Sequence, residues 1–304
     1  MAATGRRPIA ASSIRTQRRW TGVALTAPAI IALGVTALFP LLWTISLSVQ
    51  DFRVGAGGDS SFVGAENYVG VLTSPEFVQA LMQTLGYVAT TLLLELIVGL
   101  PIALALHRAT TGRRILRVIV ALPLMVAPVV AALAFKFLFS SDYGLINRGL
   151  EILGLPEPTW FADVWLARTT ILVSNLWLAL PFVVLVLLAG LANIPDELVE
   201  AARTDGASRW RTFVHIILPL LRPAILIILV IRLADAFRVF DAVYVLTGGG
   251  PANSTEVMSS YLYRLMFTRA DFPGAAAATI LFVIVIAVCA GSIFFLLRDR
   301  EDRR

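Results

Sequence analysis

The sequence has almost none of the residues used for cross-links or metal sites. Its 304 residues include one cysteine, Cys289, and two histidines, His107 and His215. A single cysteine excludes a disulfide within the chain and a cysteine-based metal site. The sequence also lacks a Gly-rich phosphate loop and a Ser-His-Asp pattern. Nothing in the chain therefore indicates a catalytic centre, a metal site or a bound cofactor.

Charged residues are also scarce, and apolar residues take their place. Only 15% of the residues are charged, whereas 58% are hydrophobic, and the mean hydropathy is +0.82. Soluble domains are roughly 45–50% apolar. The composition therefore indicates an integral membrane protein, in which most of the chain is used for membrane spans.

Six apolar runs are long enough to cross a hydrocarbon core of ~30 Å at ~1.5 Å per residue. They cover residues 23–49, 77–106, 117–139, 165–191, 220–246 and 274–297. Pro123 and Pro128 interrupt the third run. We therefore predict an all-α membrane protein with six spans in one domain, residues 21–298, between tails 1–20 and 299–304. The first run is too long for a signal-peptide core, so we expect it to be retained.

The arginines are distributed unevenly between the polar segments. The two tails, Arg298 at the edge of the second tail, and the loops 107–117 and 193–222 hold seventeen arginines, whereas the three other loops hold five. The positive-inside rule places the arginine-rich segments in the cytoplasm. We therefore expect a multi-pass protein of the cell membrane with both termini and the loop 193–219 on the cytoplasmic side.

The sequence of the loop 193–219 indicates two short helices. Pro195 suits the first turn of a helix, and the acidic residues after it favour the positive end of the helix dipole. Gly206 is typical of a helix stop, and Ser208 can cap a second helix. These features alone fit either a docking element or a solvated amphipathic linker that lies on the membrane.

The spacing of residues within this loop resembles a family signature. The loop contains Glu200-Ala201-Ala202, three residues, Gly206, nine residues, Ile216, one residue and Leu218-Pro219. This pattern is similar to the EAA loop of binding-protein-dependent ABC transporter permeases. Three further stretches resemble the carbohydrate branch of that family: KFLFSSDYGLIN, NLWLALPFVVLVLLAGLANIPDELVEAARTDGAS and VFDAVYVLTGGGPANSTEVMSSYLYRLMF. The resemblance covers roughly residues 20–298 and is strongest to the larger permease of maltose transporters and the first permease of actinobacterial trehalose importers.

The resemblance implies a type I ABC importer permease that is not an enzyme. Such a subunit would form half of the path for a disaccharide or oligosaccharide, with trehalose as the first candidate. Its expected partners are a second permease in a heterodimer, two copies of an ATPase subunit and an extracytoplasmic solute-binding lipoprotein. Membrane lipid would surround it, and no nucleic acid or cofactor is expected.

Two groups of site residues follow from the resemblance. In the family the EAA loop seats in a groove of the ATPase, and the matching residues here are Glu200, Ala201, Ala202, Asp205 and Gly206. The residues expected to line the sugar path are Asn175, Leu178, Ala179, Phe182, Asp235, Arg238 and Val239. At the positions of Ala179 and Phe182 the maltose-type permease has Gly and Tyr, so we expect a different sugar.

The charged residues within the predicted spans need an explanation, because each costs about 2.5–3.5 kcal/mol at mid-bilayer. Four of them recur every third residue with alternating sign: Arg232, Asp235, Arg238 and Asp241. They can neutralise one another along the helix or bind the hydroxyls of a sugar, and these interpretations are compatible. We expect Glu95 to pair with a basic group of another span. A lone carboxylate would instead suit a proton-coupled secondary transporter, which is the alternative function.

Overall fold

The computed structural model describes residues 25–52, 60–109 and 111–298. Both predicted tails, residues 1–20 and 299–304, lie outside these ranges. Within them the regular secondary structure is helical except for one short hairpin, in which β1 (Gln50–Phe52) pairs antiparallel with β2 (Ser60–Phe62). The all-α expectation is therefore confirmed for the described part of the chain.

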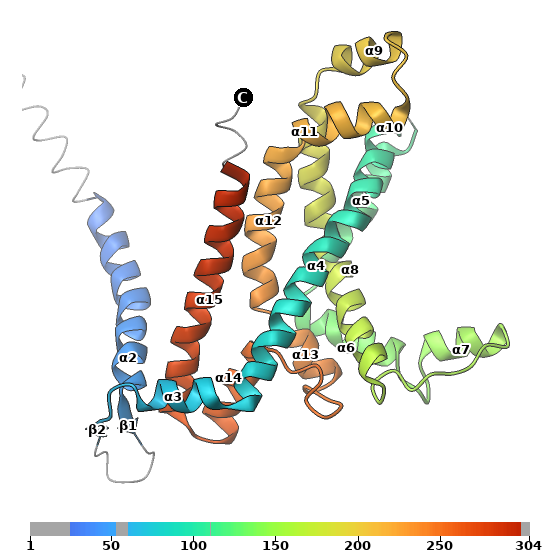
Figure 1. Ribbon diagram of the computed structural model, residues 1–304. Helices are drawn as coiled ribbons and strands as arrows, with labels where there is room; N and C mark the ends of the chain where they lie inside the picture. Colours follow the sequence, from blue (N-terminus) through green and yellow to red (C-terminus); the bar gives the residue numbers. More distant parts are fainter. Residues whose placement is uncertain (1–24, 53–59, 110, 299–304) are drawn as a thin grey trace, which may run out of the picture.

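The spanning helices agree with the six predicted apolar runs. Four described helices are long and apolar enough to cross a membrane alone: Leu25–Ser48, α4 (Pro75–Arg108), α8 (Val164–Ala192) and the Phe272–Ser292 part of α15 (Phe272–Arg298). Two bent pairs correspond to the other two runs and pass the same test only when their members are taken together. Arg113–Met125, comprising α5 (Arg113–Ala121) and η2 (Leu122–Met125), meets α6 (Pro128–Leu138) at 99°, and Arg209–Leu220 meets α12 (Arg222–Phe237) at 61°. In the second pair, α12 runs through the bundle and Arg209–Leu220 lies across its end (Figure 1).

The core of the bundle is formed by α4, which packs along α8 and against α12. Each of the two long helices has a side-chain cap at its start. Ser74 Oγ accepts from the Phe77 amide at 3.5 Å, and Asp163 Oδ1 accepts from the Trp165 amide at 2.8 Å. These bonds satisfy amides that have no partner within the helix. Both helices begin at the same end of the molecule and run side by side (Figure 1).

The first spanning helix stands apart from this bundle (Figure 1). It contains η1 (Gly34–Leu38) and α2 (Phe39–Ser48), and no residue in its most apolar 18-residue window is buried. Near its end, Ser48 Oγ and the Tyr68 hydroxyl of α3 (Glu66–Thr73) share a hydrogen bond of 2.7 Å. The helix is thus anchored mainly at its base, where it also contacts α15.

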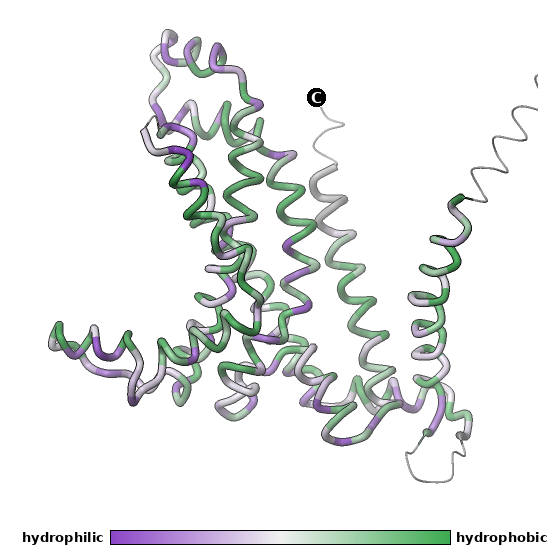
Figure 2. The backbone as a smooth tube through the Cα atoms, turned by 180° about the vertical axis from the view of Figure 1, so that it is seen from behind, coloured by the Kyte–Doolittle hydropathy of each residue, from purple (hydrophilic) through white to green (hydrophobic). Residues whose placement is uncertain are grey.

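Short helices occupy the two ends of the bundle (Figure 1). One end carries α9 (Asp196–Thr204), α10 (Arg209–Thr212), η3 (Phe213–Ile217) and α11 (Leu218–Leu220). The other end carries the hairpin, α3, α7 (Leu145–Ile152), α13 (Asp241–Leu246), α14 (Met258–Tyr263) and η4 (Arg264–Thr268). Hydrophilic residues gather at both ends, and the middle is hydrophobic (Figure 2). The carboxyl-terminal end of α15 points toward the α9–α10 end, as the even number of spans requires.

The fifth span differs from the predicted continuous run 220–246. Its helix α12 ends at Phe237, and α13 begins only at Asp241. Residues 238–240 leave the helix, with Phe240 at φ −135° and ψ −57°. Irregular backbone at membrane depth is tolerated where it lines a cavity, and these residues do so, as described below. The expectation of one long helix was wrong because an apolar run carries no mark of where its backbone turns toward a cavity.

We predict that Gly99→Ala destabilises the bundle. A Cβ at Gly99 of α4 would lie 2.7 Å from Cγ1 of Val183 in α8, and Val183 is fully buried. Overpacking of this kind costs about 1–3 kcal/mol, which lowers the unfolding temperature of the purified chain in detergent. Gly291→Ala in α15 is the matched control, because its Cβ would meet nothing within 4 Å. Equal unfolding temperatures for the two variants would contradict the close approach of α4 and α8.

Candidate functional site

A cavity of about 450 Å³ with charged side chains in its wall opens beside α8, within the range of roughly 300–1,000 Å³ that is typical of ligand pockets. Three segments form its walls: the bend of the third span, the middle of α8, and the break between α12 and α13. The lining residues are Pro123, Leu124, Val126, Pro128, Asn175, Leu178, Ala179, Arg232, Asp235, Arg238, Val239, Phe240, Asp241 and Ala242.

Six of the seven residues expected in the sugar path line this cavity: Asn175, Leu178, Ala179, Asp235, Arg238 and Val239. Phe182 does not. It lies one turn further along α8 and packs against the apolar cluster between α4 and α8. The structure thus brings together residues about 60 positions apart in sequence. That a sugar occupies the cavity stays a prediction.

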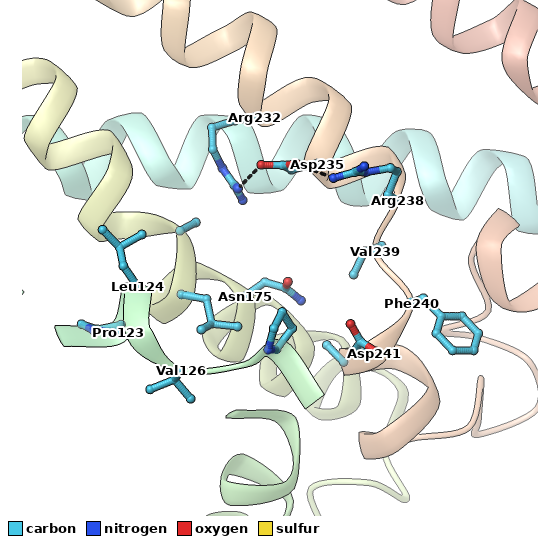
Figure 3. Close-up of a pocket in the computed structure, with 14 residues that line it drawn as sticks. Pro123, Leu124, Val126, Asn175, Arg232, Asp235, Arg238, Val239, Phe240 and Asp241 are labelled. Carbon is cyan, nitrogen blue, oxygen red and sulfur yellow. Dashed lines mark hydrogen bonds and ion pairs between the residues drawn. The ribbon is translucent and has the colours of Figure 1, made fainter. Parts of the chain in front are cut away.

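A chain of ion pairs forms one wall of the cavity (Figure 3). Arg232 Nε donates to both oxygens of Glu95 at 3.1 and 3.0 Å, and its Nη2 donates to Oε1 at 2.8 Å. Its Nη1 donates to Asp235 Oδ2 at 2.9 Å. Arg238 Nη2 donates to the other oxygen of Asp235 at 3.0 Å. The predicted ladder along the fifth span is confirmed for these residues, whereas Asp241 lies beyond the break and begins α13.

The exposure of these side chains rises from the core toward the cavity. The Glu95 side chain is fully buried, and that of Arg232 is 14% exposed, Asp235 39% and Arg238 78%. Glu95 therefore neutralises Arg232 inside the bundle, as expected from its need for a basic partner on another span. Asp235 and Arg238 present an acceptor and a donor to the cavity, which suits hydroxyl groups.

Asn175 extends this polar wall on α8. Its Nδ2 donates to the Ile171 carbonyl at 3.3 Å, a bond within its own helix. Its amide faces the space below Asp235 and Arg238 (Figure 3). The cavity is thus bounded by polar groups of two spans and by the apolar bend of a third.

Sequence reasoning missed the contribution of this bend, namely Pro123, Leu124, Val126 and Pro128. It identified the two prolines only as an interruption of the third span. The 99° bend between Met125 and Pro128 carries this segment into the cavity wall. Two prolines five residues apart in an apolar run are the signal that could have indicated it.

The second candidate site is the helical loop between α8 and α12. The expected two helices are confirmed: α9 ends before Gly206, which has φ +77°, and Ser208 Oγ accepts from the Arg211 amide at 3.3 Å to cap α10. Pro195 is the residue before α9 rather than part of its first turn. The loop protrudes beyond the bundle (Figure 1).

Four of the five residues expected to contact the ATPase are exposed at this protrusion: Glu200, Ala201, Asp205 and Gly206. Ala202 differs, because it is only 8% exposed and packs within the chain. Its small side chain therefore serves packing inside this chain in the structure, and Ala201 is the small residue on the open face.

The chain matches the family of binding-protein-dependent transport system inner membrane components over residues 95–303. The chain belongs to this family. Among its relatives, the trehalose/maltose transport system permease MalF of Thermococcus litoralis is 35% identical over 91% of this chain and 93% of that protein. The trehalose transport system permease SugA of Mycobacterium tuberculosis is 32% identical over 88% of this chain and 85% of that protein.

Solved structures agree with this assignment. The permease is similar to a chain in the crystal structure of a bacterial ABC transporter that imports the acidic polysaccharide alginate. The TM-score is 0.81 at 27% identity, and the match covers 93% of this chain and 96% of that chain. A second structure of the alginate transporter, in complex with a periplasmic protein bound to alginate pentasaccharide, gives a TM-score of 0.80 at 26% identity over 91% and 93%.

The permease therefore has the type I ABC importer fold, and it is a membrane-embedded subunit of a carbohydrate ABC importer. It is a transport component and not an enzyme, because ATP hydrolysis in this class belongs to a separate ATPase subunit. The expected fold class and family are confirmed.

We predict that Glu95→Ala strongly destabilises the permease. The substitution leaves the buried guanidinium of Arg232 without its main partner, which costs about 3–5 kcal/mol. The double variant Glu95→Met with Arg232→Leu removes both charges and should recover most of the loss. The measurement is the unfolding temperature in detergent. A single variant as stable as the unaltered permease would show that the pair does not hold α4 against α12.

Proposed function

We propose that the permease forms one half of the path for a disaccharide or oligosaccharide, with trehalose as the first candidate. We further propose that the ATPase drives the permease by acting on the loop 193–219. One observation carries this proposal. The loop joins α8 directly to α12, and these two helices supply most of the polar residues of the cavity. A force applied to the loop therefore acts on both polar walls of the cavity.

The substrate class is supported by the relatives and by the cavity. Two relatives at 32–35% identity are described as permeases for trehalose or for trehalose and maltose. The cavity offers the Asn175 amide, the Asp235 carboxylate and the Arg238 guanidinium. This mixture of donors and acceptors suits a neutral polyhydroxylated ligand.

Coupling to the ATPase is supported by the position and exposure of the loop. Glu200 lies on the exposed surface of α9, and η3 and α11 continue from α10 to the 61° elbow that leads into α12. We infer that two ATPase copies serve two permeases and that this loop fits into a groove of one copy. The loop then transmits closure of the ATPase pair to α8 and α12.

A second permease is supported by the open side of the cavity. The Arg238 side chain is 78% exposed there, and charged groups at membrane depth normally face a protein interior or a water-filled path rather than lipid. We infer that a homologous permease closes this side, giving a heterodimer with the path at its centre. The arginine distribution supports cytoplasmic termini and a cytoplasmic α9–α10 loop, which leaves the opposite end for the solute-binding lipoprotein.

We predict that Glu200→Lys abolishes assembly with the ATPase but leaves membrane insertion intact. A reversed charge at the centre of the docking helix weakens association at least about tenfold. The measurement is co-purification of the ATPase with the tagged permease. Glu157→Lys is the control, because Glu157 is an exposed carboxylate of the segment before α8. Undiminished co-purification with Glu200→Lys would remove Glu200 from the contact.

We predict that Asn175→Ala raises the sugar concentration needed for half-maximal uptake by about two- to tenfold, the equivalent of one hydrogen bond. Assembly with the ATPase should not change. Val173→Ala is the control, because Val173 is exposed on the same helix and does not line the cavity. Unchanged uptake kinetics in Asn175→Ala would show that the sugar does not contact this residue.

A further inference from the structure

A second cavity, of about 460 Å³, lies between the first halves of α4 and α8. It lies toward the end of the bundle opposite α9 and α10, where both helices begin (Figure 1). None of the residues expected in the sugar path or in the ATPase contact lines it. It is therefore separate from the cavity at Asn175 and has no assigned role.

The floor of this cavity is the segment 254–257, which is held between the two helices. Arg168 of α8 donates from Nε and Nη2 to the Ser254 carbonyl at 3.1 and 2.9 Å. On the α4 side, the Met258 amide donates to Thr84 Oγ1 at 2.8 Å. The cavity is thus built from three segments that are tied together by hydrogen bonds.

Three polar groups of this cavity have unused binding capacity. Gln83 Oε1 and Ser254 Oγ are buried and have no hydrogen-bond partner within the described part of the chain. The Arg168 guanidinium forms no ion pair with any carboxylate of the described residues. Buried polar groups are normally satisfied, so a cation with an unpaired hydroxyl beside it indicates an anionic ligand.

The carboxylates nearest in sequence are engaged elsewhere. Asp163 caps the start of α8 through the Trp165 and Leu166 amides. Glu256 is paired with Arg264. The Arg168 side chain is also held in place, because its guanidinium carbon lies 5.2 Å from the centre of the Trp165 ring. It is therefore an oriented cation rather than one free to extend into water.

Much of the remaining lining of the cavity is apolar, and its outer part faces outward. Met82 and Trp165 are largely exposed, Gly86 and Leu172 continue this surface, and the buried Val243 closes the inner side. In a membrane-spanning bundle such a surface meets acyl chains, and Trp and Arg near a helix start mark the headgroup level. Arginine binds a phosphate group through charge-assisted, often bidentate hydrogen bonds.

We propose that this cavity binds one anionic phospholipid, with its phosphate at Arg168 and Ser254 and an acyl chain along Met82 and Leu172. A hydroxyl of a glycerol headgroup fills the acceptor position at Gln83 Oε1. The lipid belongs to the non-cytoplasmic leaflet, a placement that rests on the orientation proposed above. Bound there, it holds the segment 254–257 between α4 and α8.

Native mass spectrometry of the full-chain permease in mild detergent tests this proposal. The probes are phosphatidylglycerol and phosphatidylcholine of equal chain length. The unaltered permease should retain phosphatidylglycerol preferentially, and Arg168→Gln should bind it about tenfold more weakly through loss of charge-assisted hydrogen bonds. Arg148→Gln is the matched control, because Arg148 is an exposed arginine of α7 paired with Glu151 outside the cavity.

A second variant tests the cavity without touching its charge. A Cβ at Gly86 would meet nothing within 4 Å, and Gly86 lines the cavity, so the side chain of Gly86→Leu takes up part of the cavity. The variant should lower retention of both lipids, and its unfolding temperature without added lipid should match that of the unaltered permease. This variant keeps the test decisive if Arg168→Gln loses its anchor to Ser254 and unfolds.

Three results would overturn the proposal. The first is equal retention of phosphatidylglycerol by the unaltered permease and by Gly86→Leu, or an equal loss of phosphatidylglycerol retention in Arg168→Gln and Arg148→Gln. The second is displacement of the lipid by inorganic phosphate at the same concentration, which would indicate a site for free phosphate. The third is lost capture of the solute-binding protein by Arg168→Gln with lipid retention unchanged. None of these measurements involves sugar transport, so failure here leaves the proposed transport function standing.

Discussion

The ion pair between Glu95 and Arg232 is the constraint on which the polar interior of the bundle depends. It joins α4 to α12 across 137 residues of sequence, and it leaves no net charge at the buried end of the chain of ion pairs. Because Arg232 also binds Asp235, the same guanidinium fixes the carboxylate that faces the cavity. A buried pair of this kind adds little net stability compared with apolar packing, but it fixes which groups meet. Here it sets the position of the cavity wall relative to the core.

The geometry of the loop is what makes the proposed coupling to this wall physically reasonable. Only short helices separate the end of α8 at Ala192 from the start of α12 at Arg222. At Gly190 a Cβ would lie 2.8 Å from the Ala224 Cβ, so the two spanning helices touch close to the loop. Under the proposed coupling, displacement of the loop would move them as a pair. The apolar bend at Pro123–Pro128 belongs to a different span, so such a movement would change the shape of the cavity.

Much of this architecture could be predicted from local sequence. Hydropathy gave the apolar runs, and Gly206 and Ser208 marked the boundary between two helices because their backbone and capping chemistry is local. The need of Glu95 for a basic partner was also predictable, because an unpaired buried carboxylate is costly. Which arginine Glu95 binds could not be predicted, because Arg232 reaches Glu95 only through the packing of α4 on α12. The break after Phe237 was missed because hydropathy does not show where the backbone of an apolar run leaves the helix. The helices α3 and α7 were missed because neither hydropathy nor turn residues distinguish a short helix at the membrane surface from a loop.

The first spanning helix has a consequence for how it can move. Its exposed side chains include Ile30, Leu33, Leu42 and Trp43, each more than 60% exposed. In a bilayer, acyl chains cover such side chains, and lipid tails are as apolar as a second helix would be. The helix therefore loses little hydrophobic stabilisation when its tilt changes. Because its base is held by α3 and α15, a change of tilt displaces mainly the opposite end.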